Sequence, residues 1–337
     1  MDLAENKFVG DKTMKYRHFA KTLAASFLIA VSSYAYSQSD FPQQPIRIVV
    51  AAPPGGGTDH MARVLGKAIS SNTTWTVIVE NKPGAGGTIG TDTVARAKPD
   101  GYTLSMAQTA TMAINPELFR KLSYDAMKDF TAVATIANQP VVLVVRSNSP
   151  YQTVADLQAE HKSKRLTLAT AGLGTVGQLV GKMFGHEVGS DFIEVPYRGS
   201  GPALQDVVGG TVDTMFATPP GALPLVQSGR LRALAVSSAK RLPLLPDVPT
   251  LEELGYDKFD YNEWKVLMAP VGTPPEIVER LNTEVQKALA QPSIIKQVLA
   301  AGDLPMTGSV QSAQQFVNEE FVRWRTIVRE SGLSKSN

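Results

Sequence analysis

The sequence predicts an α/β fold in which parallel or mixed sheets are covered by helices, and three observations carry this prediction. The chain has 337 residues, of which 43% are hydrophobic and 19% charged, so it can bury a large core and form two domains. Short β-branched runs alternate with amphipathic helical segments along the chain. Three of these runs, at residues 46–50, 75–80 and 166–170, are each followed by a glycine-rich loop and a helix start.

The first of these units occupies residues 46–63. Its apolar run is expected to be a buried strand, and the prolines at 53 and 54 end it. Three glycines follow, which let the backbone turn tightly and approach a bound group closely. Thr58 is the expected N-cap of the next helix. Asp59 can be interpreted in two ways. It could contact the ligand directly or through water, or it could stabilise the helix start and pair with Arg63, and the second interpretation is favoured.

The second and third units repeat this arrangement, with loops at 81–87 and 171–174 and helices from Thr88 and Thr175. At each helix start, unpaired backbone N–H groups and the positive end of the helix dipole face the loop, which makes an anion site. Three such sites in one chain predict a single cleft lined by main-chain donors.

The other expected elements follow from local pattern. Residues 102–106 form a strand that leads into a polar loop at 107–109, and capping boxes open helices at Thr153 and Thr273. Two strands, 141–145 and 264–269, are expected to cross between the domains. The remaining strands are expected at 129–137, 192–195, 212–216 and 231–237, and the remaining helices at 115–122, 176–185, 202–208 and 312–331, where the last buries Phe316, Phe321, Trp324 and Val328.

The predicted ligand site combines the glycine loops with polar residues that follow strands. It consists of Gly56, Gly57, Thr58, Asp59, Gly84, Ala85, Gly86, Gly87, Gln108, Thr109, Ala171, Gly172, Gly174, Thr175, Gln178 and Tyr197.

Composition and motifs exclude several classes of function. The net charge is only +2, so nucleic acid is not an expected partner. The absence of cysteine excludes disulfides, zinc–thiolate sites, iron–sulfur clusters and lipid attachment through an N-terminal cysteine. The four histidines lack metal-ligand spacing, and neither a nucleophile elbow nor a catalytic carboxylate pair stands out. We therefore predict no enzyme activity, no cofactor and no metal.

The N-terminus has the features of a secretory signal. A basic region begins at Met14, which is a candidate for the true first residue of the protein. A nine-residue apolar run at 23–31 follows and is too short to span a bilayer. Small residues then favour cleavage after Ser37. The expected location is the periplasm, as a soluble protein that is not a lipoprotein.

One motif supports an alternative function. Gly172, Gly174 and Gly177 match the G-x-G-x-x-G dinucleotide fingerprint, and Glu194 follows at the distance of its ribose-binding acid. The alternative is a dinucleotide-dependent oxidoreductase. Against it stand the position of the motif in mid-chain, the export signal and the lack of a placed acid–base group.

Taken together, several stretches resemble the Bug-type extracytoplasmic solute receptors of the tripartite tricarboxylate transporter system. They occur in the order of that family and cover nearly all of the mature chain. The matching residues are 54–63, 81–90, 99–104, 115–125, 195–216, 229–236, 246–255 and 269–282.

The resemblance implies a type II periplasmic-binding-protein fold with two α/β lobes, residues 38–141 plus 262–337 and residues 142–261. It implies that the first two glycine loops grip a carboxylate with main-chain amides and ordered waters. The third loop departs from the family by having Gln178 where histidine is usual, and the hinge region has Trp264-Lys-Val-Leu267 in place of W-x-G-L. The implied partners of this expected monomer are a small carboxylate and either transporter membrane subunits or a sensor.

Overall fold

The structure is a computed structural model that describes residues 41–189, 191–257 and 259–333. The predicted signal peptide, residues 1–37, lies outside the described residues. Residues 44–337 form one compact unit, and it contains the two sheets found among the described residues. None of the described helices is both long enough and apolar enough to cross a membrane.

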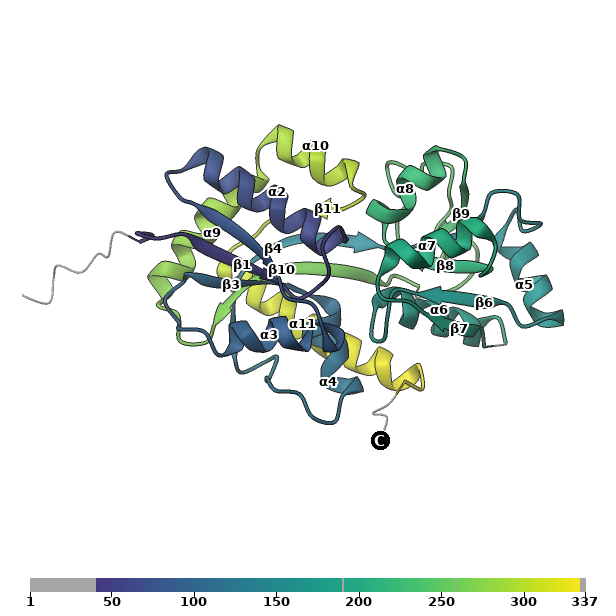
Figure 1. The fold of residues 1–337 in the computed structure, drawn as a ribbon, viewed down its shortest axis with the longest axis horizontal. Helices are drawn as coiled ribbons and strands as arrows, with labels where there is room; N and C mark the ends of the chain where they lie inside the picture. Colours follow the sequence, from purple (N-terminus) through teal and green to yellow (C-terminus); the bar gives the residue numbers. More distant parts are fainter. Residues whose placement is uncertain (1–40, 190, 258, 334–337) are drawn as a thin grey trace, which may run out of the picture. The chain divides into compact units, whose positions relative to one another are not determined.

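Sheet A has six strands in the order β11-β4-β10-β3-β1-β2 (Figure 1). Its strands β1, β2 and β3 are parallel, whereas β10 runs antiparallel to both β3 and β4. The sheet is therefore mixed, and the carboxyl ends of its parallel strands meet at one edge. The strands are β1 Ile46–Val50, β2 Val77–Asn81, β3 Thr103–Gln108, β4 Phe130–Pro140, β10 Asn262–Pro270 and β11 Leu304–Pro305.

Sheet B has five strands in the order β7-β6-β8-β5-β9. Strands β6, β7 and β8 are parallel, and β5 is antiparallel to its neighbours β8 and β9. Only Val141 separates β4 of sheet A from β5 of sheet B, so the chain passes directly from one sheet to the other. The strands are β5 Val142–Arg146, β6 Thr167–Thr170, β7 Ile193–Pro196, β8 Thr214–Ala217 and β9 Leu231–Val236.

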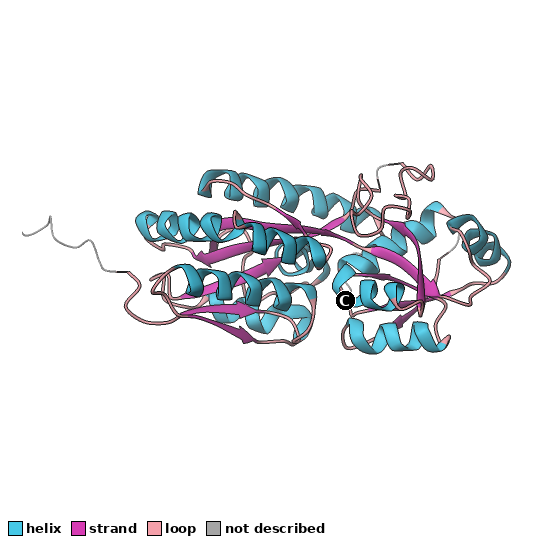
Figure 2. Ribbon diagram, turned by 90° about the horizontal axis from the view of Figure 1, so that it is seen from above, coloured by secondary structure: helices cyan, strands magenta, loops and turns pink. Residues whose placement is uncertain are grey.

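Helices lie on both sides of each sheet (Figures 1 and 2), as expected for an α/β protein. In sheet A, α2 and α10 lie on one side and α3 and α11 on the other (Figure 1). The helices are α2 Gly57–Asn72, α3 Thr88–Ala95, α4 Asn115–Leu118, α5 Val154–Ser163, α6 Val176–Glu187, α7 Ser200–Gly209, α8 Pro219–Gln227, α9 Pro275–Leu289, α10 Pro292–Ala300 and α11 Val310–Glu330.

Strand β5 shows why a central strand must be apolar on both faces. Leu143 and Val145 pack in one core cluster with residues of α5 and α6. Val142 and Val144 pack in a second cluster with residues of α7 and α8. Successive side chains of a strand point to opposite faces, so an uninterrupted apolar run is required where helices cover both.

The sequence located most elements correctly, and the capping box of Thr153 with Asp156 is confirmed. The predicted capping interactions of two helices were wrong. Helix α2 is capped by Gly56 rather than by Thr58, whose hydroxyl instead donates to Gln108. Helix α9 has Pro274 at its N-cap, and the Thr273 hydroxyl bonds back to the carbonyl of Pro270, 2.8 Å away, so the predicted capping box does not form.

Two further boundaries and the burial of two side chains differ from the prediction. Strand β3 continues through Gln108, so the expected polar loop at 107–109 is shorter, because pairing with β10 extends the ladder. A π-helical segment, residues 110–114, precedes α4. Phe316 and Phe321 pack against the core but are only partly buried, whereas Trp324 and Val328 are fully buried.

Candidate functional site

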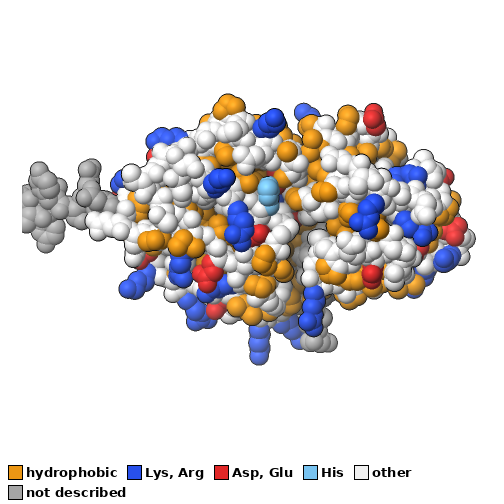
Figure 3. All heavy atoms as spheres, turned by 45° about the horizontal axis from the view of Figure 1, so that its top comes forward, with side chains coloured by type: hydrophobic (Ala, Val, Ile, Leu, Met, Phe, Trp, Pro, Cys, Tyr) orange, Lys and Arg blue, Asp and Glu red, His pale blue; other side chains and the backbone are white. Residues whose placement is uncertain are grey.

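A cavity of about 470 Å³ lies where the parallel strands of both sheets end. A furrow crosses this unit between its two halves in the space-filling view (Figure 3). The cavity is lined by segments that follow β1, β3, β6, β7 and β8, which is the usual position of ligand sites in α/β proteins. Its lining is Ala52, Pro53, Pro54, Gly55, Gly56, Gly57, Thr58, Gln108, Ala110, Val141, Ala171, Thr175, Val176, Gly177, Arg198, Gly199, Ser200, Gly201, Pro202, Met215, Phe216, Thr218 and Glu263.

Four helices begin at this cavity. The first residues of α2, α6 and α7 line it, as does Thr218, which caps α8. Helix α8 opens with two prolines and offers no N–H there, so the donors come from the other three helices. The amides of Gly57 and Thr58 do not hydrogen-bond to any other described residue. The cavity thus presents converging main-chain donors and positive helix ends, an arrangement that attracts an anion.

Among the described residues that line the cavity, Arg198 and Glu263 carry the formal charges. Arg198 is exposed, follows β7 and forms no ion pair with a described residue. Glu263 is half-buried on β10, and burial raises its pKa despite the opposing effect of the Lys265 charge. The Thr58 hydroxyl lies 3.4 Å from Glu263 Oε1 and also donates to Gln108 Oε1.

A buried polar cluster lies beside Glu263 on the same face of sheet A. Gln139 is paired with Glu263 across β4 and β10, is fully buried, and has no partner among the described residues for either side-chain polar atom. Its Oε1 lies 2.6 Å from the position that a Cβ on Gly57 would take. Lys265 Nζ forms an ion pair with Asp303 Oδ1 at 2.9 Å. The start of α2 therefore rests on polar groups, not on an apolar core.

The structure places six of the sixteen predicted site residues in the cavity lining. They are Gly56, Gly57, Thr58, Gln108, Ala171 and Thr175. The other ten do not line this cavity: Asp59, Gly84, Ala85, Gly86, Gly87, Thr109, Gly172, Gly174, Gln178 and Tyr197. Whether any of the sixteen contacts a ligand stays a prediction.

Several of the ten support the walls of the cavity. Asp59 is buried and accepts hydrogen bonds from the Gly55 amide, Asn81 and Arg63, which holds the first glycine loop. Thr109 Oγ1 accepts from the Trp264 amide at 2.8 Å. Other polar contacts include Gln178 Oε1 with the Gly174 amide, Gln178 Nε2 with Glu194, and the Tyr197 hydroxyl with Asp206.

The second glycine loop does not line the cavity, and its Ala85 has a strained backbone conformation. Gly84, Ala85, Gly86 and Gly87 all have positive φ, and Ala85 is unusual among the described residues in doing so without being glycine. Asn115 Nδ2 donates to the Gly86 carbonyl at 2.9 Å, and Asn115 Oδ1 lies 3.0 Å from the position a Cβ on Gly174 would take. Asn115 thus joins the second loop to the third.

The segment after β7 is a fourth strand–glycine loop–helix unit, which was not predicted to contribute a glycine loop to the site. There Gly199, Ser200 and Gly201 line the cavity and α7 begins, so the pattern seen at the other three loops could have revealed it. Arg198 belongs to this unit. Glu263 had no such signal, because it reaches the cavity through strand pairing with distant residues.

The residues of the dinucleotide fingerprint have packing roles. A Cβ on Gly177 would lie 2.2 Å from the carbonyl oxygen of Phe216, so only glycine lets α6 approach β8 this closely. Glu194 is bound by Gln178 Nε2 at 2.6 Å and by Lys182 at 3.0 Å. Gly177 and Glu194 therefore have structural roles at α6.

Comparison with known families identifies the family of this chain. The sequence profile of the tripartite tricarboxylate transporter family receptor, TctC, matches residues 61–333, well over half of the chain. The chain belongs to the TctC receptor family. This family is one of solute receptors, and its type II periplasmic-binding-protein architecture agrees with the two mixed sheets.

Individual relatives of this TctC-family receptor match most of its length. Protein BugT of Bordetella pertussis is 36% identical over 299 residues, covering 88% of this chain and 92% of BugT. The structure of R. palustris Rpa4515 with adipate has a TM-score of 0.84 at 33% identity and covers 88% of this chain and 100% of that one. MatC from Rhodopseudomonas palustris, with bound malate, has a TM-score of 0.79 at 34% identity, covering 86% and 100%.

Proposed function

We propose that this TctC-family receptor captures a small carboxylate in the 470 Å³ cavity and delivers it to the membrane subunits of a tripartite tricarboxylate transporter. The observation that carries the proposal is the convergence of α2, α6 and α7, whose first turns line one cavity. Related proteins were solved with adipate and malate, which are carboxylates of a size that such a cavity accommodates.

Main-chain amides would hold the carboxylate, and Arg198 would add a cationic contact from the opposite wall. Each helix N-terminus carries about half a positive charge and several unpaired N–H groups, so the grip does not depend on a cationic side chain alone. The guanidinium of Arg198 can add a charge-assisted pair with a carboxylate. This adds a cationic side chain to the main-chain amides that the sequence predicted.

Closure of two lobes on the ligand is part of the proposal. The lobes would be residues 38–141 plus 262–337, around sheet A, and residues 142–261, around sheet B. The cavity lining comes from both sets of residues, so a ligand that contacts both would favour a closed arrangement by its differential affinity.

Export to the periplasm completes the proposal and rests on residues 1–37, whose charge and hydropathy pattern is that of a signal peptide. Expression with the native N-terminus in a Gram-negative host is expected to release protein shortened near Ser37 into the periplasmic fraction. Full-length protein confined to the cytoplasm of an export-competent host would contradict export.

Calorimetric titration tests the ligand class. The protein is titrated with dicarboxylates, aromatic carboxylates, amino acids and, as neutral controls, monosaccharides. At least one acid is expected to bind, and Arg198→Ala should weaken its binding about tenfold, or ~1.4 kcal/mol, by loss of one charge-assisted contact.

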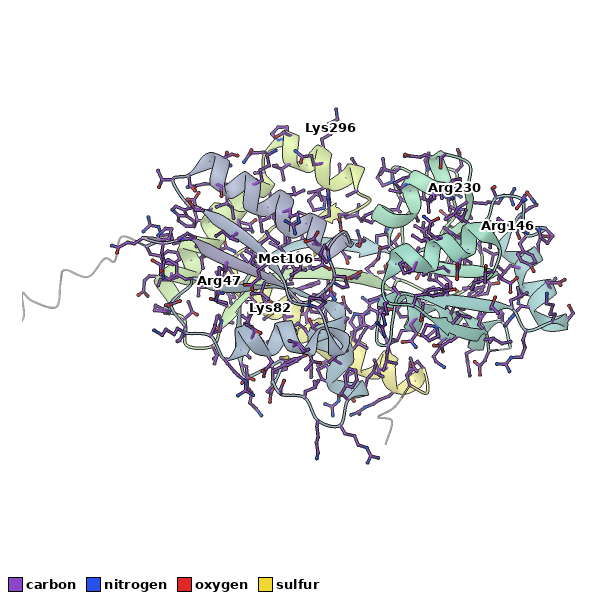
Figure 4. The ribbon with its side chains drawn as sticks, viewed as in Figure 1. Arg47, Lys82, Met106, Arg146, Arg230 and Lys296 are labelled. Carbon is purple, nitrogen blue, oxygen red and sulfur yellow. The ribbon has the colours of Figure 1, made fainter. Side chains whose placement is uncertain are left out.

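Arg230→Ala is the matched control for this titration. Arg230 is also exposed and lies in the same half of the molecule (Figure 4), but it does not line the cavity. Its replacement should leave the affinity unchanged. A monosaccharide that binds while every acid fails would refute the proposed ligand class.

A further inference from the structure

We propose that the ligand carries an ammonium group beside its carboxylate, as an α-amino acid does, and that Glu263 is the group that recognises this ammonium. The carboxylate would lie on the first-turn amides of α2. This inference rests on the proposed function and narrows its ligand class from small carboxylates in general to amino acids.

The first observation is the balance of charge around the cavity. Among the described lining residues, Arg198 contributes one positive charge and Glu263 one negative charge, so the lining has no net formal charge. A zwitterion also has none and can pair with both. A simple dicarboxylate would place two negative charges in a cavity that already holds a carboxylate, and like charges at short range repel.

The second observation is that Glu263 has a single, long hydrogen bond and no ion pair among the described residues. Thr58 Oγ1 lies 3.4 Å from Glu263 Oε1, but a hydroxyl has a single proton, and Gln108 Oε1 competes for it from closer. Lys265 does not supply a counter-ion, because its Nζ is bound to Asp303 Oδ1 at 2.9 Å. Glu263 therefore keeps unused acceptor capacity on the cavity.

The third observation is the unsatisfied amide of Gln139. This side chain is fully buried next to Glu263 on β4, and neither of its polar atoms has a hydrogen-bond partner among the described residues. Buried polar groups in native proteins are nearly always paired. An ammonium, or a water that it orders, would supply the donor that Gln139 Oε1 lacks and would fill the unused acceptor positions of Glu263.

The fourth observation is that the donors and the acceptor are adjacent. Thr58 contributes an unpaired first-turn amide, and its own hydroxyl lies against Glu263. An α-amino acid carries its carboxylate and ammonium on one carbon. One end of such a ligand therefore fits the start of α2 together with Glu263, and the rest of the cavity is left for its side chain.

Matched pairs of ligands test this inference. The protein is titrated calorimetrically with L-glutamate against glutarate, L-aspartate against succinate, L-leucine against 4-methylpentanoate and L-phenylalanine against 3-phenylpropanoate. For the pair that binds best, the amino acid is expected to bind at least about tenfold more tightly than its partner without the amino group.

Two variants assign the preference to Glu263. Glu263→Gln keeps the shape of the side chain but removes its charge, so it should weaken amino-acid binding at least about tenfold. It should also reduce the difference in affinity between the amino acid and the matching acid that lacks an amino group. Glu80→Gln is the control, because Glu80 pairs with the surface cations Arg47 and Lys82 (Figure 4) and does not line the cavity. Circular dichroism and the thermal midpoint of each variant verify that it folds.

The outcomes separate this inference from the proposed function. Tighter binding of the acids that lack an amino group, or an amino-acid affinity that Glu263→Gln leaves unchanged, overturns the role of Glu263 while the carboxylate receptor stands. If the amino acids and the simple acids all fail to bind, both proposals fall.

Discussion

Lys265 Nζ lies 2.9 Å from Asp303 Oδ1, and neither side chain is exposed to solvent. A buried charge that loses its partner is strongly destabilising, whereas replacing both partners by apolar groups often costs little. Lys265→Met is therefore expected to lower the free energy of unfolding by about 3–5 kcal/mol, measured by urea denaturation. The double variant K265M/D303L should be more stable than K265M alone. Equal or greater loss in the double variant would contradict this account of the pair.

Asp59 is expected to stabilise the first glycine loop in a pH-dependent manner. Burial acts to raise its pKa, but hydrogen bonds from Arg63, the Gly55 amide and Asn81 outweigh burial and hold the pKa below its usual value. A lowered folded-state pKa gives stability that is present above the unfolded pKa and lost as the pH falls through the folded value. Asp59→Asn should thus cost about 2 kcal/mol at neutral pH.

The difference in the free energy of unfolding between Asp59→Asn and the wild type should become smaller as the pH is lowered. Urea unfolding at about pH 7 and about pH 3, either side of the ordinary Asp pKa of about 3.9, measures it. Asp92→Asn is the control, since Asp92 forms a similar pair with Arg96 at 2.9 Å but at the surface, where such pairs contribute about 0.5 kcal/mol. A constant difference at both pH values would contradict the assigned role.

Gly177 and Gly201 both line the cavity but have different surroundings. A Cβ at Gly177 would meet the Phe216 carbonyl at 2.2 Å, whereas a Cβ at Gly201 would meet nothing within 4 Å. Gly177→Ala should lower the free energy of unfolding by about 1–3 kcal/mol through overpacking. Gly201→Ala, in the first turn of α7, should leave the free energy of unfolding unchanged or raise it slightly. Thermal unfolding followed by circular dichroism compares them, and equal midpoints would show that α6 can move away from β8.

Ligand binding is expected to draw the two proposed lobes together. Small-angle X-ray scattering should give a smaller radius of gyration in the presence of a saturating ligand that calorimetry has verified. An Arg198→Ala sample at the same ligand concentration, subsaturating for that variant, should show a smaller change. An unchanged radius in the wild type at saturation would indicate a rigid binding site.

The sequence predicted the architecture well because that information is local. Strand–loop–helix units are visible as β-branched runs, glycines and caps, and the starts of α3 and α6 fall where the pattern placed them. Capping was less predictable, since Thr58 could cap α2 or bond to Gln108, and only the neighbouring strand decides between them.

The candidate site was only partly predictable, because which face of a loop meets a cavity is a tertiary property. The loop at Gly84 to Gly87 has the expected glycines, yet its carbonyl at Gly86 turns to Asn115. Glu263 carries no motif, and it reaches the cavity through its register on β10 opposite Gln139. Cross-strand register over more than a hundred residues cannot be obtained from local pattern.

Native mass spectrometry of the protein purified from the periplasm tests the central claim most directly. A receptor that closes on its ligand can retain it through purification, so the account predicts a bound species whose mass, after release, identifies an organic acid, with an amino acid as the more specific expectation. Glu80→Gln should retain the same species, and Arg198→Ala should retain less of it. A released ligand without a carboxyl group, such as a sugar, would contradict the account.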